Sequence, residues 1–104
     1  MTELEKLWAG MDYCLWDDEI KSMKTEAVLA SEKLNSISYL DTEAREDAVR
    51  ELFGSVGENP SVFKGFNCDC GSNIEVGDNF LANYNVTILD RGPVKIGNNV
   101  MLAP

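Results

Sequence analysis

Few side chains in this sequence of 104 residues could carry acid–base or covalent chemistry. It has three cysteines, Cys14, Cys68 and Cys70, and no histidine. A cysteine nucleophile acts as a thiolate, and no histidine is available to form one, so the sequence disfavours a thiol enzyme. The spacing Cys68-Asp69-Cys70 is also shorter than the two to four intervening residues of a structural zinc pair. We therefore expect Cys68 and Cys70 to be small buried apolar residues.

Charge and composition exclude several classes of partner. Eighteen acidic residues against nine basic ones give a net charge of −9. Nucleic acids and anionic membranes bind basic surfaces, so we expect neither as a partner. No apolar run approaches the ~18 residues of a membrane span. The start, residues 1–6, is polar and acidic and does not resemble a signal peptide, which predicts a cytoplasmic protein.

The first half of the chain has a helical period. Residues 1–54 hold thirteen of the acids, which we interpret as a solvated helical surface. Thr2 and Glu5 have the spacing of a capping box, and Gly10 is expected to end or interrupt this first helix. Its apolar residues share one side, which predicts a packing face made of Leu4, Leu7, Trp8 and Met11.

Two further helices follow in the same half. The second is expected to begin after Asp17 or Asp18 and to end at Asn35-Ser36, with an apolar stripe made of Ile20, Met23, Ala27, Ala30 and Leu34. The third follows Asp41 or Thr42 and has Gly54 at its end. Its apolar residues are Ala44, Ala48, Val49, Leu52 and Phe53. We interpret both stripes as packing surfaces.

The second half changes period from helical spacing to a step of six. One apolar column is formed by Val62, Cys68, Ile74, Phe80 and Val86, and a second, two residues on, by Cys70, Val76, Ala82 and Ile88. Two residues are inserted around Asp90–Pro93, which indicates a turn. The pattern then resumes with Val94 and Val100 in one column and with Ile96 and Leu102 in the other.

The corners between these units predict a parallel β-helix. The segment at residues 74–79, IEVGDN, recurs twenty residues later as VKIGNN. Gly and Asn tolerate the backbone angles of sharp corners, so each six-residue unit reads as one short strand plus one corner. Three units and the two inserted residues make one coil of twenty. Val56–Asn59 has the same corner pattern but adjoins the third helix, so we interpret it first as a helix stop.

Longer stretches resemble one known family. Trp8-Ala9-Gly10, the acidic helices and Glu51-Leu52-Phe53-Gly54 resemble the helical cap of maltose and galactoside O-acetyltransferases, and nodulation acetyltransferases are also similar. Residues 66–74, FNCDCGSNI, resemble that family's entry into its β-helix. Residues 79–85, NFLANYN, match its most distinctive motif, and residues 93–104 match its next coil. The resemblance covers essentially the whole chain.

The resemblance implies an α+β fold, with a helical maltose-acetyltransferase-type cap over residues 1–55 and an incomplete hexapeptide-repeat β-helix over residues 56–104. The implied β-helix is left-handed, against the usual crossover preference. Family members are cytoplasmic homotrimers that transfer acetyl from acetyl-CoA to a sugar hydroxyl, without a metal. The main acetyl-CoA site is expected beyond Pro104, so we assign no residue of this chain to that ligand.

The resemblance also implies roles for individual residues. In the family a histidine shortly after the Leu-Ala-Pro stretch takes the proton from the acceptor hydroxyl. Asn83 matches an asparagine that stabilises the transition state and contacts substrate, a role that suits a fixed amide donor. Asp69 and Asp90 match positions facing the acceptor pocket, where carboxylates bind sugar hydroxyls. The alternative for all three residues is a structural role in the corners of the coil.

The chain departs from the family pattern in three places. It ends at Pro104, before the histidine, so we expect no meaningful activity from the 104 residues alone. Arg91 stands where galactoside-specific members have an acid, and Leu15-Trp16 also differs, so we assign no acceptor contact to that dipeptide. The alternative function is a non-catalytic assembly module. A β-helical carbonic anhydrase is disfavoured because its zinc site needs histidines.

Overall fold

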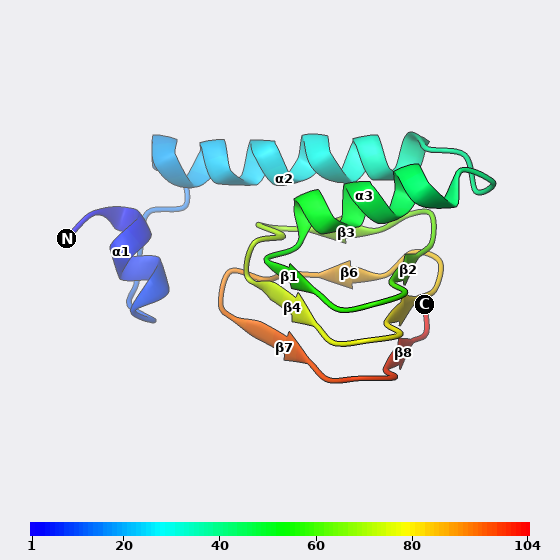
Figure 1. The fold of residues 1–104 in the computed structure, drawn as a ribbon. Helices are drawn as coiled ribbons and strands as arrows, with labels where there is room; N and C mark the ends of the chain where they lie inside the picture. The colour runs from blue at the N-terminus through cyan, green and yellow to red at the C-terminus, as the bar shows by residue number, and fades with distance from the viewer.

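The computed structural model describes all 104 residues and shows three helices followed by eight short strands (Figure 1). The helices are α1 (Glu3–Trp8), α2 (Asp18–Ser36) and α3 (Thr42–Leu52). The strands are β1 (Ser55–Val56), β2 (Ser61–Val62), β3 (Asn67–Cys68), β4 (Ile74–Val76), β5 (Leu81–Ala82), β6 (Thr87–Ile88), β7 (Val94–Ile96) and β8 (Met101–Leu102). None of the helices is long and apolar enough to cross a membrane.

The strands form three small parallel sheets, with the orders β1-β4-β7, β2-β5-β8 and β3-β6. Every paired residue lies twenty positions from its partner, as in Ser55 with Glu75 and Ile74 with Val94. Each coil therefore visits the three sheets in turn and stacks on the coil before it. The register confirms the predicted coil of twenty residues and the α+β fold, a helical cap followed by a parallel β-helix.

Asparagines turn the corners of the coils. Asn59, Asn79, Asn85 and Asn99 all have φ between 56° and 59°, the left-handed region that Asn enters more readily than most residues. Equivalent corners are also joined side chain to side chain, since Asn59 Nδ2 donates to Asn79 Oδ1 at 3.2 Å and Asn79 Nδ2 donates to Asn99 Oδ1 at 2.8 Å. The interpretation of Val56–Asn59 first as a helix stop is wrong, because α3 ends at Leu52, Val56 belongs to β1, and residues 57–59 form a corner in which Asn59 is left-handed.

The interior of the coils is the predicted apolar column. Ile74, Phe80 and Val86 are buried, as expected from the six-residue spacing. Val94 and Val100, which were also predicted to lie inside, are only partly buried. The difference has a simple cause, because no further coil packs on the last one in this chain.

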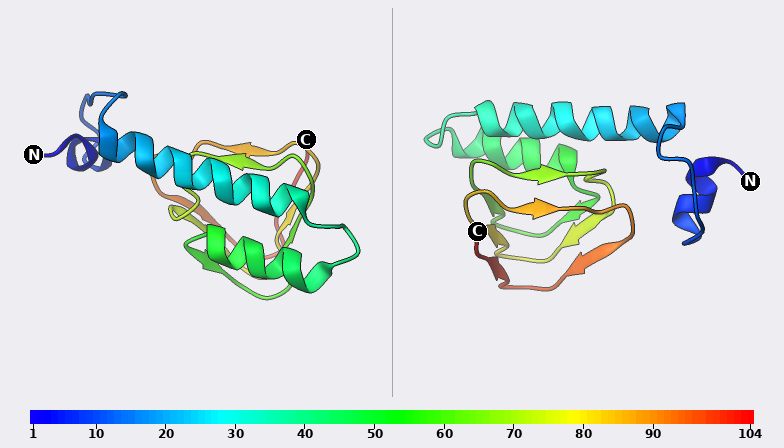
Figure 2. Two further views of the ribbon diagram at one scale, coloured as in Figure 1. Left: turned by 90° about the horizontal axis from the view of Figure 1, so that it is seen from above. Right: turned by 180° about the vertical axis from the view of Figure 1, so that it is seen from behind.

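Helices α2 and α3 lie across the opposite end of the stack, over the first coil (Figures 1 and 2). Asp17 caps α2 by accepting from the amides of Glu19 and Ile20, and Asp41 caps α3 by accepting from Ala44. The predicted stripes face the coils, and their buried residues join the strand residues in one core. From the helices, that core includes Ala27, Leu34, Ala48, Val49, Leu52 and Phe53.

Helix α1 corrects one sequence expectation. Thr2 and Glu5 form the predicted capping box, and Gly10 follows the helix with φ 74°. However, none of the helix residues is buried, and Trp8 is 60% exposed. Of the predicted packing face, Leu4 and Leu7 are partly buried, whereas Trp8 and Met11 are exposed, so the expectation is wrong for those two residues. The helix has only six residues and stands to one side of the stack, where it contacts α2 but none of the strands, so its face is covered only in part (Figure 2).

Polar side chains of the cap complete the hydrogen bonding of the first coil on all three sides. Arg50 donates to the carbonyls of Val56 and Gly57, beside β1. Arg45 donates to the carbonyl of Val62 in β2. Asn35 donates to the carbonyl of Phe66 and accepts from the amides of Gly65 and Phe66, just before β3. These main-chain groups have no coil above them, so the cap takes the place of one.

The close stacking of coils predicts different effects at two equivalent glycines. A Cβ at Gly77 would lie 2.9 Å from the carbonyl carbon of Gly97 and 3.0 Å from the amide of Asn98, whereas a Cβ at Gly97 meets nothing within 4 Å. We expect Gly77→Ala to lower the free energy of unfolding by ~1–3 kcal/mol, and Gly97→Ala to leave it unchanged or slightly higher. Urea unfolding of both variants tests this, and equal losses would contradict the stacking argument.

Candidate functional site

Asp69 and Asp90 lie together at the corner that leads from the β3-β6 sheet to the β1-β4-β7 sheet. Asp90 is fully buried, and its Oδ1 accepts hydrogen bonds from the amides of Asp69 at 3.1 Å and Cys70 at 2.8 Å. Its Oδ2 has no hydrogen-bond partner. Asn73 fixes the same corner from the other side, because its Nδ2 donates to the carbonyls of Asp90 and Arg91. The corner is held by side chains rather than by a strand ladder.

The carboxylate of Asp69 is shared between two cations. Lys24 Nζ, from α2, lies 2.6 Å from Asp69 Oδ1, and Arg91 Nε lies 3.1 Å from Oδ2. Arg91 Nη1 also donates to the hydroxyl of Tyr13 at 2.7 Å, and its guanidinium lies 5.8 Å from the Tyr13 ring centroid. The network joins the segment after α1, the helix α2 and the equivalent corners of two successive coils.

The titration of Asp69 and Arg91 follows from this pairing. Burial alone would raise the pKa of Asp69, but the hydrogen bonds and charges of Lys24 and Arg91 outweigh it, so the pKa lies below its usual value. For Arg91, burial would lower the pKa, but the bonds to Asp69 and Tyr13 outweigh burial and raise it. Asp69 is therefore a carboxylate and Arg91 a cation at neutral pH.

Asn83 lies in a different corner. It follows β5, before β6 begins, whereas Asp90 follows the end of β6, so the two residues are at opposite ends of the β3-β6 sheet (Figure 1). Asn83 is half-buried, and its Oδ1 accepts from the amide of Tyr84 at 2.8 Å, which leaves its Nδ2 donor group unused within the chain. The structure thus brings Asp69 and Asp90 together but does not bring Asn83 to them.

Cys68 and Cys70 are buried, as the sequence predicted. Burial is the main cause that raises the pKa of each thiol to about 11. The Cys68 sulfur lies 3.7 Å from Ser31 Oγ, and the Cys70 sulfur lies 3.5 Å from the Met23 sulfur. Neither thiol is a thiolate near neutral pH, which argues against Cys68 or Cys70 as a nucleophile.

Sequence reasoning missed Tyr13 and Lys24 as members of the Asp69 network. Tyr13 is 78 residues from Arg91 in sequence, and Lys24 is 45 residues from Asp69. One signal was available for Lys24, which follows Met23 at the edge of the apolar stripe of α2. Its side chain is therefore placed beside the surface that packs on the coils.

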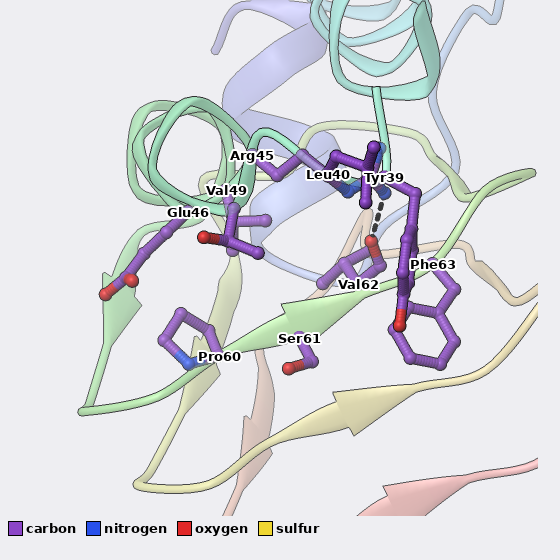
Figure 3. Close-up of a pocket in the computed structure, with 10 residues that line it drawn as sticks. Tyr39, Leu40, Arg45, Glu46, Val49, Pro60, Ser61, Val62 and Phe63 are labelled. Atoms are coloured by element: carbon purple, nitrogen blue, oxygen red, sulfur yellow. Dashed lines mark hydrogen bonds between the residues drawn. The ribbon is translucent and has the colours of Figure 1, made fainter. Parts of the chain in front are cut away.

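Two hollows on the surface differ in their relation to this network. One cavity of about 310 Å³ adjoins it and is lined by Leu15, Trp16, Ile20, Lys21, Lys24, Thr25 and Arg91. The other, of about 300 Å³, lies where α3 meets β2 (Figure 3). Its Arg45 donates to the carbonyls of Leu34, Ile37 and Val62. No predicted site residue lines this second hollow, which is the junction that fastens the cap to the first coil.

The burial of two thiols predicts selective labelling. Cys14 is exposed, whereas Cys68 and Cys70 are buried. A thiol-specific reagent at pH 8 should modify Cys14 in the native protein and react at least ~100-fold more slowly with the other two, because little thiolate is present at a pKa of about 11. Mass spectrometry of the native and the urea-unfolded protein measures this. Rapid native modification of Cys68 or Cys70 would contradict the buried corner.

The buried pairing of Asp69 predicts a pH-dependent contribution to stability. We expect Asp69→Asn to lower the free energy of unfolding by ~1–3 kcal/mol at pH 7. Because the pKa of Asp69 is depressed in the folded state, its contribution is complete above the unfolded pKa and is lost as the pH falls through the folded one. The difference from the parent protein should therefore shrink below about pH 4.

A matched control is Glu51→Gln, which breaks the exposed ion pair between Lys33 and Glu51. Exposed pairs contribute little, so this change should have almost no effect at either pH. Urea titrations of the parent and both variants at pH 7 and pH 3 make the comparison. A loss for Asp69→Asn that is equal at the two pH values would show that the ion pairs are not its source.

Comparison with known proteins identifies the family. The family model described as the maltose acetyltransferase hexapeptide capping motif matches residues 6–57. A crystal structure of a maltose O-acetyltransferase from Clostridium difficile 630 matches with a TM-score of 0.96 and 41% identity, covering 100% of this chain and 56% of that one.

Two further structures contain the acetyl donor or its product. A galactoside acetyltransferase in complex with coenzyme A matches with a TM-score of 0.91 and 34% identity, covering 100% of this chain and 52% of the other. A hexapeptide-repeat acetyltransferase from Vibrio cholerae, complexed with acetyl-coenzyme A, matches with a TM-score of 0.80 and 34% identity, covering 98% and 55%. The chain spans about half the length of the curated relatives it matches. It belongs to the family of maltose and galactoside O-acetyltransferases.

Proposed function

We propose that this protein serves sugar O-acetylation, the transfer of acetyl from acetyl-CoA to a sugar hydroxyl. The observation that supports it most is the continuous likeness of cap and coils together, over the whole chain, to a maltose O-acetyltransferase. A hexapeptide β-helix alone serves many acyl transfers, so the cap narrows the proposal to sugars. The match spans about half of that enzyme, so the complete reaction is a proposal for the complete gene product.

Asn83 is proposed to stabilise the transition state. Attack of a sugar hydroxyl on a thioester carbonyl places negative charge on the carbonyl oxygen, and a fixed amide N–H can meet that charge. The Nδ2 group of Asn83 is suited to this because the chain itself does not use it, while Oδ1 is fixed by the Tyr84 amide. The proton of the hydroxyl would go to a histidine, which is not among these 104 residues.

Asp69 and Asp90 are proposed to shape the acceptor pocket by holding other residues of it in place. Asp69 holds Lys24 and Arg91, and Asp90 holds the corner that carries Asp69. Asn83 lies at the far end of the same sheet, so within one chain it does not share a site with this corner. A homotrimer, which the family resemblance implies, is proposed to join them, with a corner of one copy meeting a different corner of the next.

Acetyl-CoA is proposed as the acetyl donor, and it supplies the activated thioester. Its phosphates carry several negative charges, whereas this chain has a net charge of −9. The cavity beside Arg91 has three basic residues in its lining, Lys21, Lys24 and Arg91. At about 310 Å³ it is too small for the nucleotide of acetyl-CoA together with the pantetheine arm. These observations assign no residue of this chain to the main acetyl-CoA site, and the proposal of this donor rests on related structures that contain acetyl-coenzyme A or coenzyme A.

The proposed function predicts a particular kinetic defect. In the complete gene product, Asn83→Ala should lower kcat for acetylation of a sugar by ~10²–10³ and change the acceptor KM less, because the lost interaction acts mainly in the transition state. Release of free coenzyme A with glucose, maltose or a galactoside as acceptor measures this. Unchanged turnover would return Asn83 to a purely structural role.

A control for the same assay is the 104-residue chain. It should show no transfer above background, since loss of a general base alone costs ~10²–10⁴ in rate. If the complete gene product were also inactive with every sugar, the remaining interpretation would be an assembly module without catalysis.

A further inference from the structure

The cavity beside Arg91 has a charge opposite to that of the chain. Three of the nine basic residues, Lys21, Lys24 and Arg91, line it, and no acidic residue is among its lining side chains. Asp69 lies behind it and balances one of the three charges. Asp18 and Glu26 flank Lys21 in the adjoining hollow, so Lys24 and Arg91 are the cations that face this cavity without an acidic residue in its lining. The lining is therefore basic in a chain whose net charge is −9.

The cations in this cavity keep unused hydrogen-bond donors. Arg91 has five N–H groups, of which Nε serves Asp69 and one on Nη1 serves Tyr13, so three stay free. Lys24 donates one of its three to Asp69. Lys21 makes no ion pair or side-chain hydrogen bond in the chain. Asp69 thus holds Lys24 and Arg91 in place while several of their N–H groups stay available. An anion bound in the cavity could accept hydrogen bonds from these groups.

The remaining wall of the cavity is apolar and aromatic. Leu15 is 46% exposed and Trp16 is 75% exposed, and both line the hollow together with the buried Ile20. An apolar wall with a few convergent polar groups is typical of small-molecule sites. The volume of about 310 Å³ suits a ligand of the size of a monosaccharide. Leu15-Trp16, to which the sequence assigned no contact, is thus placed at the mouth of a pocket.

We infer that this cavity selects an anionic acceptor, a sugar bearing a carboxylate or a phosphate group, through Lys24, Arg91 and Lys21. The inference rests on the proposed function for the acceptor role, while the charge selection rests on the cavity alone. The planar guanidinium of Arg91 matches a carboxylate or a phosphate in two-pronged geometry. A neutral sugar could accept hydrogen bonds from these side chains but could not form an ion pair with them.

The test uses the complete gene product and compares neutral sugars with sugars that carry a carboxylate or a phosphate at carbon 6 in place of the free hydroxyl. Glucuronate and glucose 6-phosphate are compared with glucose, and galacturonate with galactose, by kcat/KM. We expect at least one anionic sugar to exceed its neutral counterpart by ~10-fold or more, as one charged hydrogen bond can provide. The preference should weaken as salt is raised from 50 to 500 mM, in line with screening of a partly exposed site.

Variants locate the preference in the cavity. Arg91→Gln and Lys21→Glu should each lower the ratio of anionic to neutral kcat/KM by ~10-fold. Lys21→Glu keeps the test valid if Arg91→Gln loosens the Asp69 network, because Lys21 makes no contact on which folding depends. Lys33→Gln, an exposed lysine farther along the same helix, is the matched control and should leave the ratio unchanged.

Direct binding separates the two proposals. Calorimetry of the protein with glucuronate, glucose 6-phosphate and coenzyme A, without acetyl transfer, reports the cavity itself. Binding of the anionic sugars that Lys21→Glu weakens, without transfer to any sugar, would overturn the acetyltransferase proposal and keep the charge selection. Equal kcat/KM for charged and neutral sugars, or a loss of coenzyme A binding alone in Lys21→Glu, would overturn the anionic acceptor. The relative response to glucuronate and to glucose 6-phosphate identifies the anion.

Discussion

The main-chain donors and acceptors of the first coil need hydrogen-bond partners although no coil lies above them. The rest of the structure depends on how the helices provide these partners. In a stack of coils each strand bonds to the strands on both sides, so the end of the stack exposes a row of donors and acceptors. Asn35, Arg45 and Arg50 each take one of the three sides of that end. The apolar stripes of α2 and α3 cover the interior at the same time. The cap is thus the closing layer of the β-helix as much as a separate unit.

The same arrangement explains how the site is positioned. Because α2 is fastened to the first coil near its C-terminal end by Asn35 and along its length by buried side chains, its earlier turns are carried past the edge of the coil. Lys24 is thereby brought to Asp69, and the segment before α2 brings Tyr13 to Arg91. A side chain of the cap and two corners of different coils meet only because the cap has one fixed orientation on the stack.

Regular features of the sequence predicted regular features of the structure. The twenty-residue recurrence predicted the register of the sheets. The sequence offered two candidate caps for each of α2 and α3, and the structure has the first of each pair, Asp17 and Asp41. Two features escaped for physical reasons. The amphipathic pattern of α1 predicted burial, but a pattern does not say whether a partner surface exists. The Asp69 network joins residues 22 to 78 positions apart, and no local spacing encodes such contacts. Likewise, Asn83 and Asp90 are close in sequence, yet they lie at opposite ends of strand β6.

The corner that holds Asp69, Asp90 and Arg91 is also the place where the chain leaves its six-residue period. The other corners are short and depend on Asn and Gly, so substitutions there meet the next coil directly, as at Gly77. This corner is two residues longer per coil, although a Cβ added at its Gly71, where φ is 78°, would still lie 2.5 Å from the carbonyl oxygen of Leu52. Its shape is instead held by the side chains of Asp90 and Asn73, which bind main-chain groups of the corner from within. Arg91 lies between β6 and β7, so a substitution at this position leaves the paired strand residues in place. The corner that holds Asp69, Asp90 and Arg91 is thus shaped by side-chain contacts, whereas strand ladders shape the rest of the β-helix.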